Sequence, residues 1–251
     1  MAPFYASARS VANLTPSDLA YFDDIVAYKS IDEIVNESKL AARPWDANAC
    51  DSVSAETFTR TNISAAVGSA VGNNTGQNSV TFRAGTDGQF TATAFGSASR
   101  NISSGIGTSG EGIGTIATGS STSTATTVNS GSNEFLRFQF LNPGRSLGIT
   151  LVDFGNLSSG PLHFERVQFR FLLASVQVGS TVTKSACKTG PVQANYSVDP
   201  GGLFDEVEVR PVSTLASENS ALLVGSIRTC GVGVAPAACF APTRVASNDC
   251  P

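Results

Sequence analysis

The pattern of apolar and polar positions changes about a quarter of the way along this chain. Near the N-terminus, apolar residues recur at helical spacing: Leu19, Phe22, Ile25 and Val26. Thr15 and Pro16 precede them as a helix start. From residue 79 onward the period falls to two, which is typical of strands with one buried face. The sequence therefore predicts an N-terminal arm over residues 1–60, with one or two short helices, ahead of a β domain.

Alternating segments follow one another through the rest of the chain. They cover residues 79–83, 89–95, 134–141, 147–154, 164–173, 203–212 and 222–227. Turn residues separate them, as in Gly85–Gly88 and Asn142–Gly144. Many short strands without intervening helices predict an all-β fold, an antiparallel β-sandwich or jelly roll. We expect the sandwich to occupy residues 61–229 and a Cys-containing tail to occupy residues 230–251.

A long stretch of the chain, residues 62–133, is almost without charge. Its four charged residues are Arg83, Asp87, Arg100 and Glu111. Such a segment is either linker or β-structure whose polar face carries hydroxyl groups in place of charges. The alternation at Val80 and Phe82 favours sandwich for most of it. The Gly-rich part, residues 102–133, fits both interpretations.

The overall charge narrows the classes of partner. The net charge is −4 and only 14% of residues are charged, so no basic groove for nucleic acid is indicated. No stretch is apolar enough to span a membrane. Residues 1–14 lack the apolar run of a secretory signal, so we expect a mature form or another export route. Low charge with many hydroxyl groups is common in extracellular and cell-surface proteins.

The cysteines and asparagines also favour an extracellular location. The five cysteines are Cys50, Cys187, Cys230, Cys239 and Cys250. No C-x-x-C pair is present, so disulfides are expected, with five free thiols in a reducing compartment as the alternative. Seven asparagines stand in N-x-S/T sequons: Asn13, Asn36, Asn62, Asn73, Asn101, Asn156 and Asn195. These are candidate glycosylation sites.

The sequence carries little sign of residue sets that are typical of catalysis. His163 is the single histidine, and no G-x-S-x-G elbow accompanies it. Asp205, Glu206 and Glu208 alternate faces on one expected strand, whereas glycosidases usually draw two acids from different strands. No phosphate-binding loop is present. We expect the protein not to be an enzyme.

Four segments in order carry a resemblance to known families. They are GEGIG (Gly110 to Gly114), NEFLRFQF (Asn133 to Phe140), SLGITLVDF (Ser146 to Phe154) and GGLFDEVEV (Gly201 to Val209). This order resembles the β-sandwich domains of secreted bacterial surface proteins of the PEP-CTERM type. It is also similar to jelly-roll carbohydrate-binding modules, which carry a late FD-x-V strand. The chain departs from the sorted proteins because it lacks their C-terminal Pro-Glu-Pro, apolar helix and basic tail.

The resemblance to carbohydrate-binding modules implies one ion. In those modules the acid of the FD-x-V strand often binds structural calcium, and here that acid is Asp205. Glu134 or Asn133, at the start of the strongest strand, would add oxygen ligands of the kind calcium prefers. The alternative is that Asp205 is solvated or caps a turn. No other cofactor is indicated.

These features lead to one functional hypothesis and one alternative. We expect a non-catalytic extracellular structural protein, a subunit that assembles with copies of itself into a filament, sheath or coat. Edge strands would supply the contacts. The alternative is a carbohydrate-binding or adhesive module with a polysaccharide partner, with or without calcium.

Overall fold

The computed structural model describes residues 52–120, 126–155, 165–186, 192–213 and 220–231. The chain divides into two units, Met1–Asp46 and Ala47–Pro251, and every described residue belongs to the second. The expected N-terminal helices and most of the expected tail therefore lie outside the described residues.

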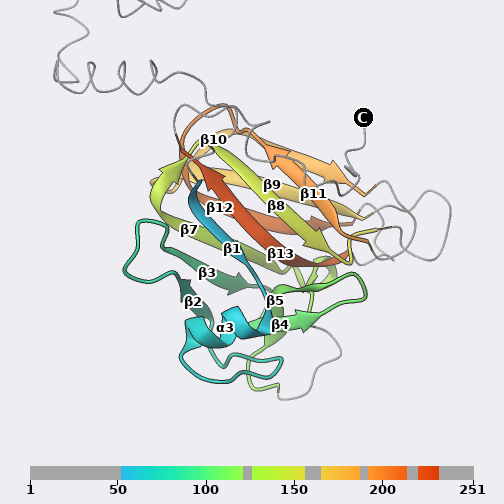
Figure 1. Ribbon diagram of the computed structural model, residues 1–251. Coiled ribbons are helices and arrows are strands. Elements are labelled where there is room, and N and C mark those ends of the chain that lie inside the picture. Colours follow the sequence, from blue (N-terminus) through green and yellow to red (C-terminus); the bar gives the residue numbers. More distant parts are fainter. Residues whose placement is uncertain (1–51, 121–125, 156–164, 187–191, 214–219, 232–251) are drawn as a thin grey trace, which may run out of the picture. The chain divides into compact units, whose positions relative to one another are not determined.

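The described residues form two antiparallel sheets (Figure 1). The first contains β1 (Ser52–Thr57), β4 (Arg100–Ile106), β5 (Glu111–Ala117), β6 (Val128–Asn129), β8 (Ser146–Val152), β11 (Ala194–Val198) and β13 (Ala221–Cys230). The second contains, in spatial order, β10 (Val176–Ser185), β9 (Arg166–Leu173), β12 (Phe204–Val212), β7 (Phe135–Gly144), β3 (Phe90–Phe95) and β2 (Ser79–Phe82). The fold is thus mostly β with sandwich-like packing, as the alternation predicts, while the jelly-roll order stays a prediction.

The faces that the two sheets bury share one apolar core. On β9, Val167, Phe169 and Phe171 are fully buried and alternate with polar residues, as the period of two requires. Buried phenyl rings continue across the second sheet, with Phe82 and Phe90 stacked at 5.2 Å between centroids. Ile149, Leu151 and Ile227 supply the facing side from the first sheet.

Among the elements that the sequence pattern did not predict are a strand and a helix near the start of the described residues. β1 lies within the range expected to be the arm, yet it pairs with β13, with Glu56 opposite Ile227. The sandwich therefore begins earlier than residue 61. Helix α3 (Arg60–Val67) follows it, and Thr59 caps its N-terminus by accepting a hydrogen bond from the Asn62 N–H at 3.1 Å. Its Ile63 is fully buried in the core.

One expected turn is strand. The Asn142–Gly144 segment has turn composition, but β7 continues through Gly144 and the chain reverses at Arg145 before β8 begins. A Cβ atom on Gly144 would stand 2.9 Å from Cβ of Thr229 on β13. The glycine is therefore needed for the close approach of two strands and not for the turn.

Candidate functional site

The Gly-rich hairpin β4–β5 forms one wall of the candidate site. Its central residues are buried on both faces. A Cβ atom on Gly114 would collide with the backbone oxygen of Thr126, and one on Gly105 would stand 2.5 Å from Leu223 Cδ2. The glycines therefore let the segment that begins at Thr126 lie directly on the hairpin. This contact places β6 and the short 3₁₀ helix η2 (Ser130–Ser132) opposite β4 and β5.

A buried ion pair lies between these elements. Arg100 on β4 donates from Nε to Oε1 of Glu134 at 2.7 Å, and the two side chains are only 12% and 8% exposed. Oε2 of Glu134 accepts further hydrogen bonds from the Thr115 hydroxyl at 2.5 Å and the Asn129 N–H at 2.9 Å. A buried carboxylate needs this many donors to offset its desolvation. Glu134 therefore holds β4, β5 and β6 together.

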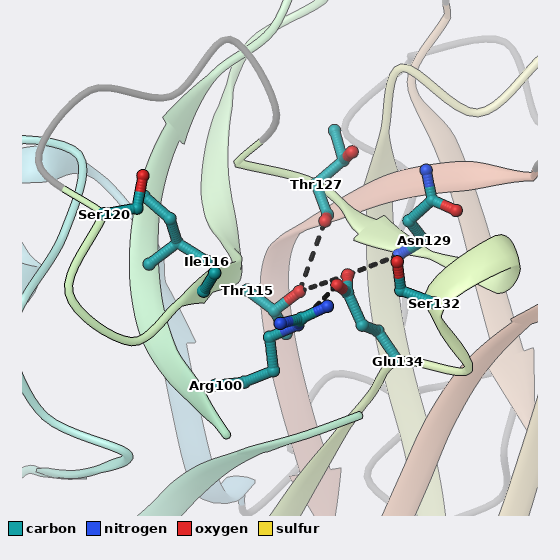
Figure 2. A pocket seen from close by; sticks show the side chains of 9 residues that line it. Arg100, Thr115, Ile116, Ser120, Thr127, Asn129, Ser132 and Glu134 are labelled. Atoms are coloured by element: carbon teal, nitrogen blue, oxygen red, sulfur yellow. Dashed lines mark hydrogen bonds and ion pairs between the residues drawn. The ribbon is translucent and has the colours of Figure 1, made fainter. Parts of the chain in front are cut away.

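A pocket of about 210 Å³ opens beside this ion pair (Figure 2). Its lining comprises Arg100, Thr115, Ile116, Ala117, Ser120, Thr127, Asn129, Ser132 and Glu134. Four of these residues carry donors that bond to no other described residue: Nη1 and Nη2 of Arg100, Oγ1 of Thr127, Nδ2 of Asn129 and Oγ of Ser132. The charges of Arg100 and Glu134 cancel. The pocket therefore offers hydrogen-bond donors without net charge.

The expected calcium ligands do not come together. Glu134 precedes β7, whereas Asp205 lies beside the far end of that strand, where Phe204 pairs with Gly144. Both carboxylate oxygens of Asp205 accept from the Ala174 N–H at 3.1 Å, which is the turn-capping role. Within the described ranges, no group of three or more His, Cys, Asp or Glu side chains is placed to hold a metal ion. Calcium binding at Asp205 or Glu134 stays a prediction.

The sequon asparagines differ in their surroundings. Asn62 donates from Nδ2 to Glu56 at 3.0 Å, and Asn195 accepts from the Thr150 hydroxyl at 2.7 Å. Asn73 accepts from Arg60 at 2.9 Å, and Asn101 is only 6% exposed. Three others lie outside the described residues: Asn13, Asn36 and Asn156. Glycosylation stays a prediction for all seven.

Cys230 is buried at the end of β13, opposite Ser52 of β1. The remaining cysteines lie outside the described residues: Cys50, Cys187, Cys239 and Cys250. His163 lies outside them as well. The pairing of the five cysteines stays a prediction.

The sequence indicated Glu134 as a calcium ligand and did not indicate the other residues of the pocket. Arg100 carried the one available signal, because it is among the few charges in residues 62–133. A lone arginine in an uncharged strand is expected to have an acidic partner. Thr115, Asn129 and Ser132 are indistinguishable in sequence from the many other hydroxyl and amide residues nearby.

Comparisons with known proteins do not show a family for this chain. No family model matches it, and no curated protein matches it. A solved structure with weak similarity is the N-terminal part of the Clostridium thermocellum endo-1,4-beta-D-xylanase 10B, with its CBM22-1 and GH10 modules in complex with xylohexaose. The TM-score is 0.30 and the identity 11%, over 73% of this chain and 29% of that one. A likeness of this degree establishes neither a shared fold nor a shared ligand.

Proposed function

We propose that the protein is a non-catalytic extracellular module that binds carbohydrate, with one sugar unit in the pocket beside Arg100 and Glu134. The observation that carries the proposal is the convergence of unbonded donors on this pocket, from Arg100, Asn129 and Ser132. Sugar hydroxyl groups accept such bonds and donate in return. Sites for small polar ligands commonly combine a few fixed polar groups of this kind.

The electrostatics of the pocket favour a neutral ligand. Arg100 is already paired with Glu134 at 2.7 Å, so an anionic ligand would have to share the guanidinium with a buried carboxylate. A hydroxyl group needs no such exchange. Glu134 is also held by Thr115 and Asn129, which suits a carboxylate that positions other groups and does not transfer protons.

Two conservative variants test the pocket. Asn129→Asp keeps the Oδ1 atom that accepts from the Gly131 N–H at 2.7 Å, but it replaces the Nδ2 donor with an acceptor. Ser132→Ala removes the hydroxyl donor. Because one hydrogen bond to a neutral partner is worth about 1 kcal/mol, each variant should weaken binding by about fivefold to tenfold. Ser79→Ala, which removes a hydroxyl on β2, is the matched control and should bind as the original chain does.

The measurement is a glycan array followed by calorimetric titration of the best glycan, with and without a calcium chelator. Binding that weakens by about fivefold to tenfold in the two pocket variants and is kept in Ser79→Ala supports the proposal. An array without any bound glycan overturns it, as does a glycan that binds all three variants equally. Loss of binding in the presence of the chelator would support the prediction that the protein binds calcium.

Assembly with copies of the chain is a second hypothesis, favoured by strand β10. This edge strand pairs with β9, and six of its ten residues are exposed along its length, including Val176 at 70%. A long exposed edge is a template for strand addition. Electron microscopy of the purified protein should then show polymers that Val176→Lys disperses. A monodisperse monomer at high concentration would contradict the assembly hypothesis and leave the pocket proposal untouched.

A further inference from the structure

The outer face of the second sheet carries a cluster of arginines. We name it the arginine face, and its members are Arg137 on β7, Arg166 and Arg170 on β9, and Arg210 on β12. All four alternate with buried core residues on their strands, so they point away from the core. Neighbouring strands lie about 4.8 Å apart, so Arg137 and Arg170, with β12 between them, stand about 10 Å apart.

Two buried glutamates form ion pairs with arginines of the arginine face. Glu208 accepts from Arg137 at 2.7 Å on one side and from Arg170 at 3.4 Å on the other. Glu206 adds a longer contact to Nε of Arg137 at 3.5 Å. The glutamate side chains are 5–7% exposed, whereas Arg137 and Arg170 are 35% and 46% exposed. The glutamates therefore fix the guanidinium groups while the arginines keep donors toward solvent.

A stack of two rings holds the guanidinium groups of Arg210 and Arg137. Phe95 and Phe135 stack across β3 and β7, with 4.7 Å between centroids and 5° between planes. Arg210 lies 4.3 Å over Phe135, and Arg137 lies 4.8 Å over Phe95. Arginine groups held in this way lose little side-chain entropy when they bind a ligand.

The charge of the arginine face opposes that of the chain. Four arginines over two glutamates leave a formal charge of +2, while the whole chain carries −4. Polar side chains border the arginines on the same face, including Gln168 opposite Arg210 and Gln177, which accepts from Arg170 at 3.2 Å. A pre-oriented cationic surface of this kind is complementary in charge to an anionic polymer.

We infer that the arginine face binds an anionic polysaccharide, one that carries carboxylate or sulfate groups along an extended chain. Guanidinium groups bind carboxylate and sulfate oxygens through paired hydrogen bonds. Guanidinium groups already lie over Phe95 and Phe135, so stacking of neutral sugars or nucleic-acid bases on these rings is disfavoured. The inference is independent of the pocket, because the two sites share no residue.

The test measures binding of polygalacturonate, an acidic polysaccharide, at several salt concentrations. The double variant Arg166→Gln/Arg170→Gln removes two exposed charges and leaves the Arg137–Glu208 pair in place. It should bind at least about tenfold more weakly and with a smaller dependence on salt. Arg145→Gln, in the exposed turn between β7 and β8, is the control and should keep affinity and salt dependence.

Each outcome decides the inference. Binding that falls in the double variant and persists in Arg145→Gln supports it. Absence of binding at low salt overturns it, as does an equal loss in Arg145→Gln, which would indicate net charge alone. Tighter binding of a single-stranded oligonucleotide of matched charge would also overturn it. The pocket variants Asn129→Asp and Ser132→Ala should leave polygalacturonate binding unchanged, which separates this inference from the proposed function.

Discussion

The β4–β5 hairpin and the β7–β12–β9 strands reach close packing by opposite means. In the hairpin, glycines at 105, 112 and 114 remove side chains so that Thr126 and Leu223 lie against the backbone. In the β7–β12–β9 strands, large phenyl rings fill the core, and arginine–glutamate pairs cover the outer face. Low charge in the first region therefore reflects burial on both faces, and high charge in the second reflects one face open to solvent. In these two regions, the content of charged residues thus indicates whether one face or both faces of a strand are buried.

The largest expected effect on stability comes from a comparison of substitutions on the two faces of β7. Phe138 is fully buried between Phe58 and Phe90, with centroids 5.9 and 6.3 Å away. Phe138→Ala should lower the free energy of unfolding by about 4 kcal/mol, because it leaves a large cavity. Phe135→Ala, on the outer face, should cost about 1 kcal/mol. Chemical denaturation measures both, and equal losses would contradict the division into a core face and a solvent face.

The next effect tests the glycine packing. Gly114→Ala should lower the free energy of unfolding by about 2–3 kcal/mol, because its Cβ meets the Thr126 backbone oxygen. Gly72→Ala is the control, since nothing lies within 4 Å of a Cβ there. It should change stability by less than about 0.5 kcal/mol. A neutral Gly114→Ala variant would show that the hairpin does not depend on this contact.

A third effect concerns a glutamate that is buried without an arginine. Burial raises the pKa of the Glu165 carboxyl from its ordinary value of 4.5 to about 7, against hydrogen bonds from the Ala221 and Gly155 N–H groups that lower it. The charge of Asp153 adds to the increase in this pKa. The folded state then holds a proton that the unfolded state releases, so stability falls as pH rises from 4.5 to 7.

The decline in stability attributable to Glu165 should be about 3 kcal/mol across that interval. Glu165→Gln should flatten the curve of stability against pH, whereas Asp87→Asn, in an exposed turn, should keep its slope. Denaturation at several pH values between 4.5 and 7.5 provides the measurement. An unchanged slope in Glu165→Gln would assign the pH dependence to another group.

The smallest expected effect on stability concerns the ion pairs between Glu208 and the arginine face. Glu208→Gln removes the charge that Arg137 and Arg170 share, yet both arginines stay partly hydrated. We expect a loss of about 1 kcal/mol, smaller at high salt. Thermal unfolding at two salt concentrations checks it. A loss as large as that of Phe138→Ala would mean that the ion pairs, and not the aromatic core, hold these strands.

The sequence predicted several of the strands that bury a single face, but not β11. Alternation located β2, β3, β7, β9 and β12 within a few residues of their observed bounds. It could not predict β4 and β5 with certainty, because strands buried on both faces by glycine lack a period of two. Helix α3 was hidden in the uncharged stretch, although Thr59 and Gly68 are suitable caps.

The pocket was less predictable than the fold. Its residues come from β4, β5, β6, η2 and the segments next to β5, β6 and β7, so they meet only once the sheets have formed. Glu134 was expected to be a site residue because it starts a strong strand. Its partner Arg100, 34 residues earlier in the chain, is linked to it by packing alone. The alternation on β9 showed that its arginines share one face. That arginines of β7 and β12 lie beside them could be known only from the order of the strands in the sheet.

Strand β13 has a consequence for how the protein is made. It is the last described strand, yet β1, β5, β6 and β8 all pair with it. The hydrogen bond from the Ser54 N–H to the Thr229 hydroxyl spans 175 positions of the chain. The first sheet therefore cannot close until β13 has left the ribosome, and the early strands of that sheet must wait with their edges unpaired. Long-range closure of this kind is slow. A nascent chain stopped before Ala221 should accordingly stay sensitive to protease, however complete its aromatic core.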